Sequence, residues 1–120
     1  MAVVMGGAPE GIDVDDPWEA IEACYREGWT DGLPVVPPTE ALVEKMLSAG
    51  PWAPDHVLLY EPVRARAVSA AKAAINAVMA GCRPEYLPVL LAAVEAMADP
   101  AFNPNGVRVT ARGAGASWRA

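Results

Sequence analysis

The sequence has few aromatic residues, no cluster of basic residues and no long apolar run. Lys and Arg number 9 against 15 Asp and Glu, giving a formal net charge of −6. Without a basic patch, a nucleic acid is excluded as the expected partner. No apolar run approaches the roughly 20 residues that span a bilayer, and the N-terminus lacks the basic and apolar regions of a signal peptide. We therefore expect a cytoplasmic protein with no membrane partner.

Cysteine and histidine are also scarce. Cys24 and Cys82 lie far apart and in no CxxC spacing, which favours two reduced thiols over a disulfide framework or a zinc site. His56 is the one histidine, and its neighbours show no metal-ligand spacing, so we expect it to be solvated. The sequence predicts no metal site and leaves any cofactor unknown.

Proline and glycine are plentiful, at 12 and 10 of the 120 residues, and they separate the helical stretches. This content is too high for a simple helical bundle. The length predicts one domain or part of one. We expect a flexible arm over residues 1–14, a single α-rich domain over residues 15–112 and a tail over residues 113–120.

Capping signals predict the first two helices. Asp16 followed by Pro17 is a typical N-cap and first helical residue, and Gly28 is placed to end that helix. Thr39 can cap a second helix over residues 40–48. The expected buried residues are Trp18, Ile21, Ala23, Cys24 and Tyr25 in the first helix, and Leu42, Val43, Met46 and Leu47 in the second.

Two further helices are apolar around most of their circumference. The first is Ala-rich, has only Lys72 and Asn76 as polar residues and ends at Gly81, and the second covers residues 84–97. Such helices must be covered on more than one side. A monomer of this size buries only about two-thirds of its unfolded surface. Because hydrophobic residues make up 53% but aromatic residues only 7%, we expect a partner chain to complete the packing.

The remaining segments predict little regular structure. Residues 29–39 form a Pro-rich extended loop, because each proline restricts the residue before it. Residues 56–61 are apolar and bounded by prolines, which is typical of a strand, and residues 107–110 are a second candidate. The expected fold is an α-rich α+β unit of about four helices with two short strands.

The junction between the last two helices holds the first group of candidate site residues. Cys82, Arg83, Glu85 and Tyr86 would supply a thiol, an anion binder, a carboxylate and a phenol around one helix start, suited to a small anionic substrate. Cys82, Glu85 and Tyr86 are the catalytic candidates, because a helix N-terminus favours a thiolate. The alternative is that Cys82 fills a tight corner, Glu85 only complements the helix dipole and Tyr86 packs its ring.

Asn76, Thr30 and Asp31 are, with Arg83, the substrate-binding candidates. The Asn76 amide needs a partner on its apolar helix, either the Pro-rich loop backbone, which we favour, or a buried water or a substrate. Thr30 and Asp31 could close a pocket around the helix junction. Asp31 precedes Gly32, however, and is equally a turn former.

Two segments carry a family resemblance. DGLPVVPPT at residues 31–39 and AINAVMAGCRPEYLPVLLAAVEAMADPAFN at residues 74–103 resemble the N-terminal part of the UGSC family of bacterial (seleno)proteins, over roughly residues 25–103 and in the same order. Members of that family continue into a selenocysteine-or-cysteine, glycine, serine, cysteine motif, whose paired chalcogens imply redox chemistry. The present sequence departs after Asn103 and lacks that motif.

The resemblance implies a fragment or, as we favour, one subunit of a split version of the family. We then expect the small subunit of a hetero-oligomeric bacterial enzyme that acts on a small molecule and forms one wall of an active site shared with a second chain. Thiol or redox chemistry and lyase or hydratase chemistry both stay open. The alternative is a non-catalytic structural or regulatory subunit that stabilises a catalytic partner.

Overall fold

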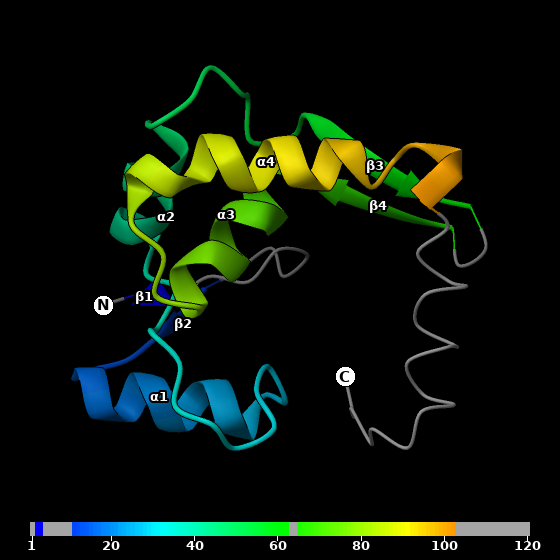
Figure 1. Ribbon diagram of the computed structural model, residues 1–120. Coiled ribbons are helices and arrows are strands. Elements are labelled where there is room, and N and C mark those ends of the chain that lie inside the picture. The colour runs from blue at the N-terminus through cyan, green and yellow to red at the C-terminus, as the bar shows by residue number, and fades with distance from the viewer. Residues whose placement is uncertain (1, 4–10, 63–64, 103–120) are drawn as a thin grey trace.

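The computed structural model describes residues 2–3, 11–62 and 65–102 (Figure 1). Within them lie four α-helices and two antiparallel sheets of two strands each. The helices are α1 (Pro17–Arg26), α2 (Glu40–Leu47), α3 (Ala70–Met79) and α4 (Leu87–Ala96); the strands are β1 (Ala2–Val3), β2 (Ile12–Asp13), β3 (Val57–Glu61) and β4 (Arg66–Ser69). Two 3₁₀ turns are η1 (Pro84–Tyr86) and η2 (Pro100–Phe102). The predicted α+β class is confirmed.

Three helices begin at a residue whose side chain accepts a backbone N–H. Asp16 accepts two such bonds at the start of α1, at 2.8 and 2.9 Å. Thr39 and Ser69 each accept one at 3.3 Å, at the starts of α2 and α3. These bonds satisfy N–H groups that have no partner within the helix. The predicted starts at Asp16 and Thr39 are therefore confirmed.

Two helices end at a glycine in the left-handed region. Gly28 follows α1 with φ of 73° and Gly81 follows α3 with φ of 78°. The next residues, Trp29 and Cys82, each donate their backbone N–H to a carbonyl of the last helical turn at 2.9 Å. This is the Schellman arrangement, in which glycine avoids the strain that a side chain would meet. Trp29 and Cys82 are thereby fixed next to the helix ends.

The buried side chains form two clusters. The main core joins α2, α3, α4 and β3, and consists of Val43, Met46, Leu58, Ala73, Ala74, Ile75, Ala77, Val78, Leu87 and Leu91. The N-terminal core joins α1 to the β1 and β2 segments, and consists of Val3, Val14, Ala20, Ala23 and Cys24. Figure 1 shows α3 between α4 and α1. As predicted, α3 is covered on more than one side.

Helix α4 is buried on one side only. Leu87 and Leu91 are fully buried in the main core. The opposite residues recur at the spacing of a helical stripe and are exposed; this outer α4 face consists of Val89, Ala92, Ala93, Ala96 and Met97. Val89 is 74% exposed. The described residues thus leave half of this apolar helix uncovered, as the length of the chain predicted.

Three details of the predicted helices are wrong. In α1 the buried residues are Ala20, Ala23 and Cys24, while Trp18 and Tyr25 are 74% and 59% exposed. Only small side chains fit where α1 packs against the N-terminal strands. In α2, Leu42 is 40% exposed and not buried. The α-helical part of the last helix begins at Leu87, because residues 84–86 form the 3₁₀ turn η1.

The strands differ more from expectation. β3 agrees with the prediction over residues 56–61, but β4, which pairs antiparallel with it, was not predicted as a strand. Part of the predicted N-terminal arm is also ordered, since β1 pairs with β2 and Val3 bridges Thr39. The candidate strand 107–110 and the tail 113–120 lie outside the described residues.

The Pro-rich loop of residues 29–39 is non-helical, as predicted, and it passes the end of α3. The Val36 N–H donates to the Met79 carbonyl at 3.2 Å, and Pro38 is fully buried. The loop therefore has a fixed path between α1 and α2. None of the helices in the described part of the chain has the length and apolar character needed to cross a membrane.

Candidate functional site

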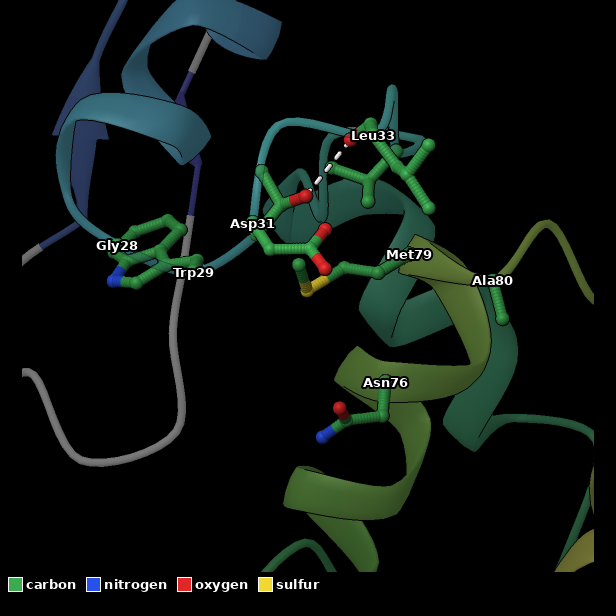
Figure 2. A pocket seen from close by; sticks show the side chains of 9 residues that line it. Gly28, Trp29, Asp31, Leu33, Asn76, Met79 and Ala80 are labelled. Atoms are coloured by element: carbon green, nitrogen blue, oxygen red, sulfur yellow. Dashed lines mark hydrogen bonds between the residues drawn. The ribbon is translucent and has the colours of Figure 1, made fainter. Parts of the chain in front are cut away.

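Two pockets lie on either side of the crossing between the loop and α3. The first pocket measures about 530 Å³ and is lined by Gly28, Trp29, Thr30, Asp31, Leu33, Val35, Asn76, Met79 and Ala80 (Figure 2). The second pocket measures about 180 Å³ and is lined by Val36, Leu42, Lys45, Met46, Val78, Gly81, Cys82 and Pro84. The loop thus supplies Trp29, Thr30, Asp31, Leu33 and Val35 to the first pocket and Val36 to the second.

The residues of the predicted site do not all lie in one pocket. Thr30, Asp31 and Asn76 share the first pocket, whereas Cys82 lines the second. Thr30 and Asp31 therefore do not line the pocket that Cys82 lines. Between them in sequence, the Val36 N–H bonds the Met79 carbonyl at the end of α3.

Thr30 uses its hydroxyl to hold the loop. Its Oγ1 donates to the Leu33 carbonyl at 2.8 Å and accepts the Gly32 N–H at 3.4 Å. Gly32 has φ of 115°, a conformation that favours glycine. The side chain that bonds this turn is thus Thr30 and not Asp31. The exposed Asp31 carboxylate makes no hydrogen bond or ion pair within the part of the chain that the structure describes.

Asn76 is exposed, and its amide does not bond the Pro-rich loop in the described part of the chain. Its Nδ2 donates to the Lys72 carbonyl at 2.8 Å, one turn earlier in α3. A carbonyl only accepts hydrogen bonds, so the nitrogen must face Lys72 and the oxygen must face away. Figure 2 shows this oxygen on the side toward Asp31. The expectation that the amide bonds the Pro-rich loop is corrected accordingly.

Cys82 has a clear packing role. It is half-buried against the main core, and its backbone N–H is used at the end of α3. Because α4 begins only at Leu87, Cys82 does not lie at an α-helical N-terminus. Its position matches the alternative in which this residue fills a tight corner.

The neighbours of Cys82 do not form a bonded group with it. Arg83, Glu85 and Tyr86 are exposed and do not line either pocket. Over residues 65–102, no side-chain hydrogen bond or ion pair involves any of these three or Cys82. A catalytic role for Cys82, Glu85 or Tyr86 would need groups from outside the described part of the chain.

Two residues near the first pocket were not among the candidates predicted from the sequence. Trp29 lines the pocket and also packs against the N-terminal core, and its residue type alone does not distinguish these two roles. Cys24 is fully buried in that core, and its burial raises the pKa of the thiol although a backbone hydrogen bond opposes the rise. Among the described residues, no group of three His, Cys, Asp or Glu side chains could hold a metal ion.

The first pocket has the composition of a binding site. It presents a carboxylate, an amide oxygen and an indole beside apolar side chains, and none of its described lining residues is a cysteine or a histidine. Comparisons of the chain with models of protein families, with curated proteins and with solved structures found no match. The first pocket and the outer α4 face are therefore the two features on which a function can rest.

Proposed function

We propose that this chain is the small subunit of a hetero-oligomeric bacterial enzyme and forms one wall of a small-molecule site shared with its partner. The observation that carries the proposal is the outer α4 face. Its residues repeat at the spacing of a buried helical stripe but are exposed, with Val89 at 74%. The main core already occupies the inner face of the same helix. A helix with two apolar faces is suited to lie between two packed layers.

The first pocket supports the shared site. Binding pockets usually bury most of the ligand surface. Here the loop side is open, since Asp31 is exposed and Leu33 is 71% exposed. A second surface would be needed to close the pocket over a ligand.

The resemblance to the N-terminal part of the UGSC family supports the same proposal. A split version of that scaffold would place the missing motif on the partner. The reaction would then be thiol or redox chemistry if the partner carries the chalcogen pair, and lyase or hydratase chemistry is the other possibility. In either case Cys82, Glu85 and Tyr86 would act only with groups from the partner.

A second candidate is a non-catalytic subunit that stabilises a catalytic partner. It is favoured by the packing role of Cys82 and by the absence of bonds among Cys82, Arg83, Glu85 and Tyr86 in the described residues. Cys82→Ala separates the two candidates. Loss of turnover in an intact complex supports the shared active site, whereas unchanged turnover, or failure of the complex to assemble, supports the stabilising role.

The docking surface can be tested by co-purification with the product of the adjoining gene. Val89→Asp places a charge in the outer α4 face without touching the main core, so we expect it to abolish recovery of the complex. Trp18→Asp is the matched control, because Trp18 is also 74% exposed but lies on α1. Equal recovery of the complex with both variants would contradict docking through α4.

A further inference from the structure

The first pocket carries a single formal charge among its described lining residues, the carboxylate of Asp31. The basic residues Lys72 and Arg26 lie close to lining residues in sequence, and each has a partner outside the lining. Lys72 lies one turn before Asn76, but its Nζ donates to the Ala67 carbonyl at 3.3 Å. Arg26 lies just before the pocket residues in sequence and pairs with Glu27 at 3.9 Å. The Asp31 carboxylate is thus available to a ligand.

Asn76 adds a second acceptor. Its amide nitrogen is held by the Lys72 carbonyl, which leaves the oxygen to face the pocket. The Thr30 hydroxyl already donates to Leu33. The polar side chains of the pocket thus offer oxygen acceptors and no free charged donor, an arrangement that repels an anion.

The rest of the lining favours a ligand with an apolar body. Trp29, Leu33, Val35 and Met79 supply an indole ring, two aliphatic groups and a thioether. Figure 2 shows Trp29, Asp31 and Asn76 around the same space. An indole face attracts cations through its quadrupole, more strongly than other aromatic rings. One carboxylate and one amide oxygen are too few ligands for a hard metal ion, which takes six or more oxygens.

We propose that the first pocket binds a small organic ammonium ion through Asp31, Asn76 and Trp29. This inference rests on the proposed function, because it names the class of ligand that binds to the wall of the shared site that this chain contributes. The ammonium head lies between the carboxylate and the amide oxygen, against the indole. The apolar part of the ligand contacts Leu33, Val35 and Met79.

The test is a titration of the full chain with small-molecule probes. Binding is monitored through the NMR signal of the Trp29 indole N–H. Choline is the cationic probe, 3,3-dimethylbutan-1-ol is its neutral isostere, and acetate is the anionic probe. We expect choline to shift the Trp29 signal and to bind at least about threefold more tightly than the isostere, which lacks the cation–π and ion-pair attractions. Asp31→Asn should remove this preference. Asp55→Asn, which removes the same charge from an exposed turn outside the pocket, should retain it.

Equal binding of choline and the isostere, or tighter binding of acetate, would overturn the ammonium assignment. So would the absence of any Trp29 shift at about 10 mM choline, a concentration that detects even millimolar affinity. An unchanged preference in Asp31→Asn would also exclude Asp31 as the binding group. None of these results bears on docking through α4, so failure of the ligand class is distinguishable from failure of the proposed function.

Discussion

Cys24 is a buried thiol whose environment makes stability depend on pH. Burial raises its pKa in the folded chain above the value of an unfolded thiol, so the unfolded chain loses this proton first as pH rises. The unfolded state then binds fewer protons, and the free energy of unfolding falls. The contribution of this thiol to the free energy of unfolding is constant below about pH 8.5, the ordinary pKa of a thiol. It declines as the pH rises from there toward the pKa of the thiol in the folded chain.

Urea unfolding of the wild type and Cys24→Ala between neutral and alkaline pH tests this prediction. The difference in unfolding free energy between the two proteins should be constant at neutral pH. It should shrink at alkaline pH, since only the wild type carries the thiol. A difference that stays constant over the whole range would show that Cys24 does not couple stability to pH. Other titrating groups affect both proteins and cancel in the comparison.

The sequence predicted several site residues but not their partners. Thr30, Asp31 and Asn76 were candidates from residue type alone, and the structure places all three in the first pocket. The bond from Asn76 to Lys72 was missed, because only partners outside its own helix were considered for this amide. Trp29 was missed because an aromatic residue gives no local signal that distinguishes a pocket wall from a core.

At the scale of elements, α4 differs on its two faces. Leu91 is fully buried and Val89 is 74% exposed. We expect Leu91→Ala to lower the free energy of unfolding by about 2–5 kcal/mol, since it leaves a cavity in the main core. Val89→Ala should change it by no more than about 0.5 kcal/mol, as usual for surface substitutions. Denaturant unfolding of the isolated chain measures both, and similar costs would contradict this orientation of α4.

Local signals predicted helix ends better than strands. Asp16, Thr39, Gly28 and Gly81 act through bonds to residues within one helical turn, so their effect can be predicted from the sequence. Strand β4 exists because it pairs with β3, and its short segment has no strong preference of its own. Strand β1 likewise exists because it pairs with β2. Strand formation depends on neighbours that a single segment does not reveal.

At the scale of the whole molecule, the two cores are joined through the Pro-rich loop. The loop leaves α1, crosses the end of α3 and reaches α2, so the first pocket lies between the N-terminal core and α3. In Figure 1, α4 lies beyond α3 from α1. A partner that covers α4 and also closes the pocket would therefore need to extend around α3.

The central claim is that this chain is completed by a partner on the outer α4 face. Sedimentation velocity of the chain alone, and of the chain with the product of the adjoining gene, tests it most directly. We expect the chain to form one defined complex when the partner is present. A chain that stays a stable 12.6 kDa monomer, both alone and in the mixture, would contradict the account.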